Sequence, residues 1–173
     1  MNERRWTLAE LNAMDRDGFS RVVGPVFECS AWIAGIAWAQ RPFPTLDSLH
    51  AALCAVVKEA GETRQIDLIQ AHPDLVGRAA AAGTLTAASQ HEQSSAGLDR
   101  LNSTDTAAFT KFNAEYRERF GFPFVICARL NKKEAILAAF PVRLQNNRSE
   151  EIQTALGEIS KIARLRLEDL VRS

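Results

Sequence analysis

Residues 149–171 read SEEIQTALGEISKIARLRLEDLV, and this stretch decides the fold class. Its apolar side chains return at steps of three and four residues, the period of one helix face, at Ile152, Leu156, Ile159, Ala163 and Leu170. The same spacing recurs along most of the 173 residues, whereas strict alternation of apolar and polar residues is absent. The sequence therefore predicts an all-α fold, a single-domain bundle of roughly eight to ten helices over residues 1–173.

Residues that cap or break helices place the boundaries of the other predicted helices. Gly61 and Gly121 stop two of them, and the pair Gly24 and Pro25 breaks a long apolar segment. Pro141 lies inside a predicted helix, where we expect a kink or the early start of a new turn. The predicted helices cover residues 46–57, 62–71, 86–101, 106–120, 132–145 and 149–171, and the helical period also runs through residues 8–14 and the broken apolar segment 22–40.

Composition and charge exclude several classes of protein. The 21 Lys and Arg residues balance the 21 Asp and Glu residues, so the chain lacks the excess positive charge that binds a nucleic-acid backbone. Its longest apolar stretch, residues 31–39, is shorter than the ~20 residues that cross a bilayer. Residues 1–5 lack the apolar core of a signal peptide. We therefore expect a cytoplasmic protein with no nucleic-acid or membrane partner.

The cysteines and histidines do not form a recognised metal-binding pattern. Cys29, Cys54 and Cys127 lie far apart in apolar surroundings, which predicts buried, reduced thiols. No pair has C-x-x-C spacing, and the three histidines do not form H-x-x-x-H. Glycine-rich nucleotide loops are absent as well. The sequence thus predicts neither a metal nor an organic cofactor.

Arg166 interrupts the apolar stripe of the last helix. It stands where the spacing of three and four places a core residue. A guanidinium buried there needs an anion, because an unpaired buried charge is heavily penalised. That anion is either a ligand or a protein carboxylate, unless the side chain reaches the surface. Arg143, three residues after Phe140, is a weaker case of the same kind.

The predicted helix over residues 86–101 gathers polar groups on one face. Ser89, Glu92, Gln93 and Ala96 share this face by their spacing of three and four. Two interpretations stay open, because Ser89 and Glu92 also have the spacing of a capping box. His91 points away from this face and is a packed or exposed histidine by its position.

His72 precedes Pro73 and therefore lies at a helix boundary, since the residue before proline avoids the helical region. It either caps the preceding helix or serves in proton transfer, for which histidine is the best matched side chain near neutral pH. Further along, residues 122–127 break the helical period. They predict a short buried strand or an extended segment, whose backbone groups are available to a ligand.

Taken in order, the motifs of this chain resemble those of the 2-oxo-4-hydroxy-4-carboxy-5-ureidoimidazoline (OHCU) decarboxylase family. The resemblance covers nearly the whole chain, and the order and joint presence of the motifs make it specific. It is carried by LNAM at 11–14, FECSAW at 27–32, HPDL at 72–75, GTLT at 83–86, SQHEQ at 89–93, AGL at 96–98, FGFPFVICA at 120–128 and KIARLRL at 161–167.

The resemblance implies an all-α fold, usually a homodimer, that forms (S)-allantoin from OHCU in urate degradation without metal or organic cofactor. It implies functional coupling to the hydroxyisourate hydrolase that precedes this step. The family's catalytic histidine corresponds to His72 and its assisting carboxylate to Glu92. The implied substrate contacts are Pro73, Ser89, Gln90, His91, Gln93, Arg166 and the backbone of Phe124, Val125, Ile126, Cys127 and Ala128.

Two other classes of function are compatible with a pocket built from these residues. A non-catalytic helical module would bind a purine-derived metabolite or a partner helix there. A cofactor-free hydrolase or deaminase would act on a related hydantoin, with the same base and anion clamp but with a positioned water. Only decarboxylation releases carbon dioxide, so analysis of the products separates the three.

Overall fold

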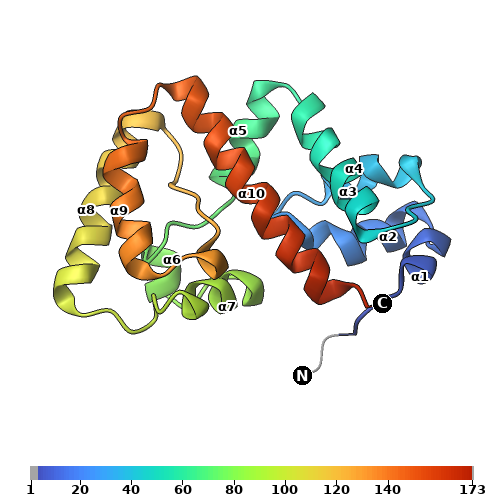
Figure 1. Ribbon diagram of the computed structural model, residues 1–173, viewed down its shortest axis with the longest axis horizontal. Coiled ribbons are helices and arrows are strands. Elements are labelled where there is room, and N and C mark those ends of the chain that lie inside the picture. The colour runs from blue at the N-terminus through green and yellow to red at the C-terminus, as the bar shows by residue number, and fades with distance from the viewer. Residues whose placement is uncertain (1–3, 173) are drawn as a thin grey trace. The chain divides into compact units, whose positions relative to one another are not determined.

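The structure is a computed structural model that describes residues 4–172 (Figure 1). Within these residues it contains ten α-helices, three short 3-10 helices and no strand beyond the single bridge between Trp6 and Val171. The all-α fold and the predicted number of helices are thus confirmed. The chain divides into two compact units: the first runs up to Ala71 and takes in the segment from Ser160 onward, and the second is His72–Ile159. The prediction of a single domain stays a prediction.

The first unit is built around packed short helices. It contains α1 (Leu8–Ala13), α2 (Arg16–Val23), η1 (Gly24–Val26), α3 (Trp32–Ala37), η2 (Trp38–Gln40), α4 (Leu46–Glu59), α5 (Glu62–Gln70) and the end of α10 (Arg148–Leu170). Helix α2 packs against α3, and α3 packs against α4. Their apolar faces form a core that includes Leu11, Phe19, Ile33, Leu49 and Leu53. The predicted break at Gly24 and Pro25 is confirmed, because η1 begins there with the proline in its first turn.

The two ends of the described chain are joined within the first unit. The N–H of Trp6 donates to the carbonyl of Leu170 at 2.9 Å, and the N–H of Arg172 donates to the carbonyl of Trp6 at 2.8 Å. The guanidinium of Arg5 donates to the carbonyls of Glu168, Asp169 and Val171. These bonds satisfy carbonyl groups at the C-terminal end of α10 that have no partner within the helix.

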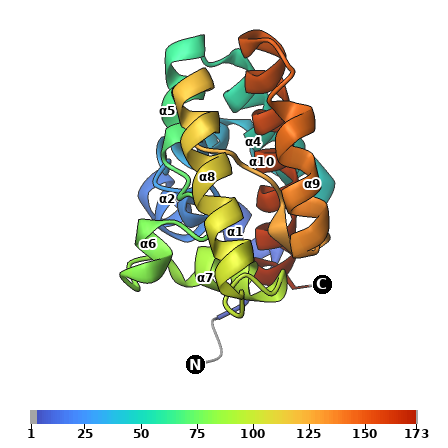
Figure 2. The ribbon, with the colours of Figure 1, turned by 90° about the vertical axis from the view of Figure 1, so that its left-hand side faces the viewer.

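The second unit has an aromatic core. It contains α6 (Arg78–Ala81), α7 (Ala87–Ser95), α8 (Ser103–Phe120), η3 (Ala128–Leu130), α9 (Lys133–Arg143) and the first part of α10. Helices α8 and α9 lie side by side (Figure 2). Between them, the rings of Phe124 and Phe140 stack, and Tyr116 meets both rings edge to face. Aromatic pairs of this geometry add stability beyond the apolar area that they bury.

Several helix boundaries differ from the prediction, and α2 begins at Arg16, six residues before the predicted segment 22–40. The helix predicted over 86–101 ends at Ser95, because Gly97 adopts a φ of +76° and the N–H of Leu98 bonds to the carbonyl of Gln93. Helix α8 begins three residues before the predicted position 106, because the side chain of Asn102 caps it. The four-residue helix α6 was not predicted. Helix α9 continues through Pro141 to Arg143, so no new turn starts there.

The prediction of buried cysteines is correct for Cys127 but not for Cys29 or Cys54. All three thiols are free, and Cys127 is buried, but Cys54 is half-buried and Cys29 is exposed. Cys29 follows η1 and adopts a φ of +48°, a turn conformation that its apolar neighbours did not reveal.

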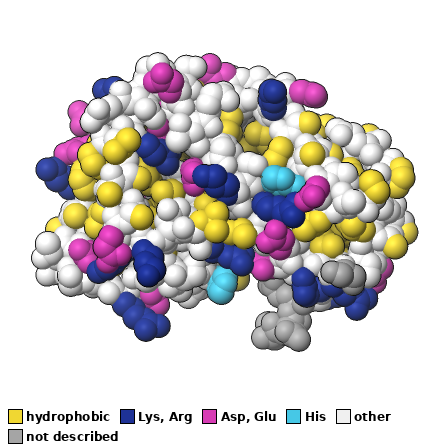
Figure 3. Space-filling model, viewed as in Figure 1, with side chains coloured by type: hydrophobic (Ala, Val, Ile, Leu, Met, Phe, Trp, Pro, Cys, Tyr) yellow, Lys and Arg dark blue, Asp and Glu magenta, His cyan; other side chains and the backbone are white. Residues whose placement is uncertain are grey.

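The surface carries mixed charge. Lys and Arg side chains are interspersed with Asp and Glu side chains over both units (Figure 3). Among residues 4–172, no helix is both long enough and apolar enough to cross a membrane.

Candidate active site

His72 opens the second unit at the point where α5 has ended. Ala71 still has helical dihedral angles, and Pro73 prevents His72 from continuing the helix. The boundary predicted at this histidine is therefore confirmed. The side chain of His72 is only 6% exposed, which is unusual for a residue in a connecting segment.

Three side chains from two helices anchor the segment that follows His72. The N–H of Val76 donates to Oε1 of Gln93 on α7 at 3.1 Å. Asn113 on α8 donates through Nδ2 to the carbonyl of Leu75 at 2.8 Å. One turn further along α8, Arg117 donates through Nε to both carboxylate oxygens of Asp74, at 2.9 and 3.0 Å. The loop after His72 is thereby tied to both α7 and α8.

The anchored loop contains a strained residue. Val76 has a φ of +55°, in the left-handed region that a β-branched side chain rarely adopts. Such a conformation costs about 1–3 kcal/mol and persists only where the surroundings fix it. The bond from Val76 to Gln93 and the pair of Asp74 with Arg117 supply that fixation. Backbone strain of this kind is concentrated at functional sites.

Helix α7 buries the polar face that its sequence predicts. Ser89, Glu92, Gln93 and Ala96 are all buried, whereas Gln90 and His91 are exposed. The capping-box interpretation of Ser89 and Glu92 is wrong, because the helix is capped one turn earlier. The side chain of Thr86 accepts from the N–H of Ser89 at 3.2 Å. A cap therefore does not explain why the carboxylate of Glu92 is buried.

Residues 122–127 form a buried extended segment rather than a strand. Several of its backbone groups are bonded within the second unit. The carbonyl of Val125 accepts from Nη1 of Arg143 at 2.6 Å, and the N–H of Cys127 donates to Glu158 at 2.8 Å. Asn131 donates to the carbonyl of Cys127. For the backbone groups of Phe124 and Ile126, residues 4–172 supply no hydrogen-bond partner.

The position of this extended segment is also set by η3, which follows it directly and packs against α7. Within the second unit, the structure thus connects three regions that the sequence analysis singled out. The loop after His72 is bonded to Gln93, and the segment 124–128 reaches α7 through η3.

A buried charged network supports the extended segment from its other side. Nε of Arg143 donates to Oε1 of Glu151 at 2.7 Å, and the hydroxyl of Tyr116 makes a short hydrogen bond to the same oxygen. Asn146 donates to Oε2 of Glu151. The guanidinium carbon of Arg143 also lies 4.2 Å from the ring centroid of Phe124. Burial, aided by the neighbouring carboxylate, raises the pKa of Tyr116, so its hydroxyl keeps its proton and remains a donor.

The spacing around Arg143 predicts that it needs an anion but does not identify Glu151, which is fully buried. The burial of Glu151 could have been inferred from the helical period. Glu151 stands four residues before the buried Ala155 and eight before the buried Ile159, so it shares their inward face.

Arg166 lies in the first unit and is paired there with a carboxylate. Its Nη1 is 2.9 Å from Oε2 of Glu28, and the two side chains are 8% and 5% exposed. The same nitrogen lies 3.4 Å from the carbonyl oxygen of Pro25. Of the two anions considered for Arg166, the structure thus contains the protein carboxylate. The sequence analysis did not single out Glu28, because its partner stands 138 residues away.

No metal centre is evident in the part of the chain that the structure describes. Within residues 4–172, no group of three or more His, Cys, Asp or Glu side chains has the spacing to hold an ion.

Comparison with known proteins agrees with the resemblance of the motifs. The profile of the OHCU decarboxylase family matches residues 12–168. The 2-oxo-4-hydroxy-4-carboxy-5-ureidoimidazoline decarboxylase of Mus musculus is 43% identical over 95% of this chain and 92% of its own length. That of Halalkalicoccus jeotgali is 41% identical over 96% of this chain and 92% of its own.

A solved structure agrees as well. A crystal structure of (S)-allantoin synthase superposes with a TM-score of 0.77 at 26% identity and covers 96% of this chain. The chain spans 54% of that longer protein. Since the family profile and the relatives extend along nearly the whole sequence, the chain belongs to the OHCU decarboxylase family.

Proposed function

We propose that this protein decarboxylates OHCU and forms (S)-allantoin in urate degradation. The names of its relatives give the substrate, and the name of the similar solved structure gives the product. The observation that carries the proposal is the burial of Glu92 beside Gln93, which binds the loop after His72. A buried histidine and a buried carboxylate on connected elements are the groups that acid–base chemistry requires.

The chemistry of OHCU needs few groups from the protein. One ring carbon carries both the carboxylate and a hydroxyl, and its neighbour carries the ureido group and a C=N bond. When the bond to the carboxylate breaks, its electron pair enters the adjacent C=N, and carbon dioxide leaves. The substrate therefore contains its own electron sink, a function that a cofactor supplies in other decarboxylations.

His72 and Glu92 have the catalytic roles in this proposal. His72 takes the proton of the substrate hydroxyl as a general base and assists the departure of carbon dioxide. Glu92 orients His72 or the substrate, and its negative charge disfavours a carboxylate nearby. The hydroxyl then becomes a carbonyl, one proton is added to the carbon that bears the ureido group, and a second proton is added to the ring nitrogen of the former C=N bond. The face that receives this proton determines the (S) configuration.

The remaining predicted residues bind the substrate in this proposal. Arg166 holds a carbonyl or ureido oxygen, and Glu28 fixes the position of its guanidinium. A guanidinium carries five N–H donors, so bonding to Glu28 is compatible with binding a second acceptor. The backbone of residues 124–128 grips the ring edges, and its groups at Phe124 and Ile126 are the ones suited to this. Contacts from Pro73, Ser89, Gln90, His91 and Gln93 complete the proposed set.

Three expectations about the protein's context stay predictions: a homodimer, a cytoplasmic location, and functional coupling to the hydroxyisourate hydrolase. None of them is needed for the proposed chemistry.

The test follows the optical activity of the product. Urate is treated with urate oxidase and hydroxyisourate hydrolase, with and without this protein, and circular dichroism records allantoin as it forms. We expect rapid growth of the (S) signal together with release of carbon dioxide, because the uncatalysed route gives a racemate. A matched sample of His72→Asn at equal concentration is the control for adventitious catalysis.

Unchanged racemic product from a protein that melts cooperatively would reject this substrate. A ligand-induced rise in melting temperature without turnover would then favour the binding module. Product formation from a related hydantoin without carbon dioxide would favour the hydrolase or deaminase.

A further inference from the structure

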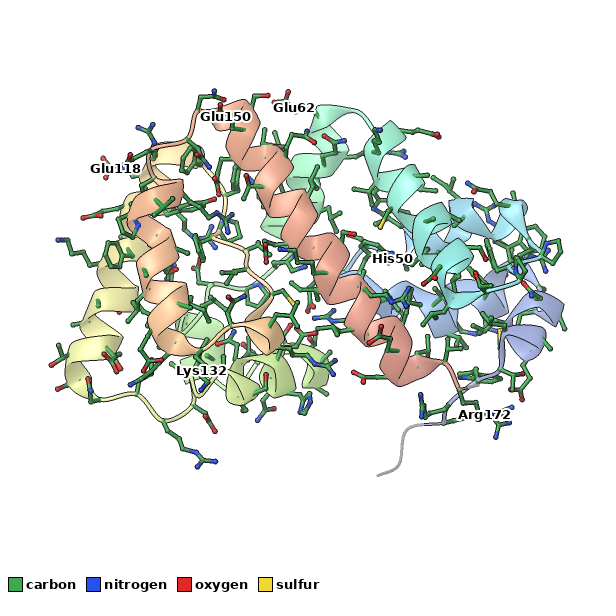
Figure 4. The ribbon with its side chains drawn as sticks, in the orientation of Figure 1. His50, Glu62, Glu118, Lys132, Glu150 and Arg172 are labelled. Carbon is green, nitrogen blue, oxygen red and sulfur yellow. The ribbon has the colours of Figure 1, made fainter. Side chains whose placement is uncertain are left out.

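A second cluster of chemically reactive side chains lies within the first unit, where α4 meets the C-terminal part of α10. His50, labelled in Figure 4, lies on α4. Cys54 stands one turn further along the same helix, and Ser160 comes from α10. Sγ of Cys54 lies 3.4 Å from Nε2 of His50 and 3.2 Å from Oγ of Ser160. Nε2 of His50 lies 2.9 Å from the carbonyl oxygen of Ser160. None of these three residues belongs to the site proposed above.

The carbonyl of Ser160 fixes where the protons lie in this cluster. A carbonyl oxygen only accepts, so Nε2 of His50 must carry a proton for the bond at 2.9 Å to form. That N–H is also within reach of the sulfur of Cys54. Because Nε2 is then not an acceptor for the hydroxyl of Ser160, this hydroxyl is able to donate to the sulfur. Two donors therefore converge on Sγ, an arrangement that favours the thiolate over the thiol.

We propose that Cys54 is a nucleophilic thiol, held as a thiolate by His50 and Ser160, and that small soft electrophiles such as peroxides and alkylating agents modify the protein there. The thiolate, rather than the thiol, is the form that attacks such reagents. Cys54 is half-buried as a residue, in contrast to the buried Cys127. This combination of partial exposure and convergent donors is typical of reactive rather than structural cysteines.

The directions in which the pKa values of Cys54 and His50 are shifted agree with this geometry. Burial acts most strongly on Cys54 and raises its pKa, but the hydrogen bonds from His50 and Ser160 and the charge of His50 together lower the pKa below its ordinary value. The hydrogen bond with Cys54 raises the pKa of His50, against the opposing effect of burial. The imidazolium and the thiolate thus stabilise each other.

Arg164 is a charged neighbour that opposes the stabilisation of the His50 imidazolium. Arg164 on α10 lowers the pKa of His50, but its guanidinium is itself paired with Asp47 and with Glu168. Helix α3, which packs against α4, carries no titratable side chain. Helix α5 meets the end of α4 through Gln65, and its titratable residues are Glu62, Arg64 and Asp67.

With hydrogen peroxide the step is a two-electron oxidation. The thiolate sulfur attacks one peroxide oxygen, an S–O bond forms and the O–O bond breaks. The sulfur is oxidised to a sulfenic acid, and the peroxide is reduced to hydroxide. The hydroxide takes the proton of the His50 imidazolium and leaves as water. With iodoacetamide, an S–C bond forms, the C–I bond breaks and iodide departs with the electron pair.

The first test measures alkylation by iodoacetamide as a function of pH, with Cys29 of the same molecule as the internal reference. Cys29 is exposed, so accessibility favours it over Cys54. Peptide mass spectrometry follows both sites, and each rate is expressed relative to its own plateau at high pH. We expect Cys54 to reach half of its plateau at a lower pH than Cys29. An equal or higher midpoint for Cys54 would overturn the proposal without any variant being made.

Variants then identify the groups that activate the sulfur. We expect Ser160→Ala, which removes the hydroxyl but keeps the carbonyl, and His50→Gln each to slow alkylation of Cys54 at pH 7. The loss should be larger for His50→Gln than for Ser160→Ala, because His50 lowers the pKa of Cys54 through both its hydrogen bond and its charge. Alkylation of Cys29 should not change, and far-ultraviolet circular dichroism checks that each variant is folded. If both variants are folded and neither slows the reaction of Cys54, the assignment is wrong.

The second test uses dilute hydrogen peroxide with dimedone, which traps sulfenic acids. We expect Cys54 to be labelled before Cys29, and Cys54→Ser to lose that early label. Labelling of Cys29 first would overturn the peroxide assignment. Both readouts are adducts on the protein and do not depend on its decarboxylase activity.

Discussion

Gln93 accepts a hydrogen bond from the backbone N–H of Val76 at 3.1 Å and thereby ties the loop after His72 to the helix that carries Glu92. One amide side chain thus connects the two groups to which the catalytic roles are assigned. Val76 holds a strained backbone conformation at this point, so the bond also offsets a conformational cost.

Replacement of Gln93 by leucine should therefore reduce both stability and turnover. The N–H of Val76 loses its acceptor, and an unsatisfied donor of this kind costs about 1–3 kcal/mol. Gln93→Glu keeps an acceptor oxygen and should retain more of the stability. Urea unfolding and the circular-dichroism assay for (S)-allantoin measure the two effects. Ser94→Leu, at an exposed position of the same helix and outside the proposed site, is the control. Wild-type behaviour of Gln93→Leu in both assays would show that this bond does not hold the loop.

Replacement of His72 by asparagine should leave a folded protein that has lost about 10²–10⁴-fold in turnover, the range of a general acid–base group. Glu92→Gln should also lose turnover. Thr86 already caps α7, so we expect Glu92→Gln to lack the loss of about 1 kcal/mol that accompanies a broken cap. Steady-state rates and thermal melts of the two variants are compared with the wild type. Near-normal turnover of a well-folded His72→Asn would exclude the role assigned to it.

The role of Arg166 is tested by replacing it together with Glu28, because its guanidinium is bonded to that buried carboxylate. Arg166→Met removes the guanidinium that pairs with the buried Glu28, and breaking such a pair costs about 3–5 kcal/mol. The double variant Arg166→Met with Glu28→Met should recover much of that stability. If Arg166 contacts the substrate, turnover stays low in the double variant. Turnover that returns with stability would instead assign Arg166 a purely structural role.

The pair of Arg143 and Glu151 should behave as a coupled unit. Each single replacement by methionine leaves one buried charge uncompensated, and we expect a loss of about 3–5 kcal/mol. The double variant should be less destabilised than the sum of the single variants, by about 0.5–3 kcal/mol. Urea unfolding of the four proteins gives this coupling energy. Additive losses would mean that each residue is held by other partners, such as Tyr116 and Asn146 around Glu151.

Much of the fold could be predicted because its signals are local. Gly121 adopts the left-handed conformation that ends α8, and the inward polar face of α7 follows from spacing alone. Gly97 carried the same stop signal for α7, but the apolar residues beyond it extended the predicted helix too far. Helix α6 is a single turn, too short for a period to appear.

The partners of buried charges could not be predicted from such signals. The spacing around Arg166 indicates that it needs an anion, but nothing near it in the sequence identifies Glu28, 138 residues away. The same holds for the cluster around Cys54, whose donor Ser160 stands 106 residues later. These contacts depend on how distant segments pack. Sequence periodicity indicates which face of a helix is buried, but not which distant side chain that face meets.

The division of the chain has a consequence for synthesis on the ribosome. The second unit is one continuous stretch, so all of its contacts are available once residue 159 has emerged. The first unit needs the last segment of the chain as well, and its bond from Arg5 to the carbonyl of Val171 spans 166 positions. Loops of this length are closed late and at an entropic cost. During translation, the helices made first therefore lack the contacts of the C-terminal part of α10 until residues 160–170 have been synthesised.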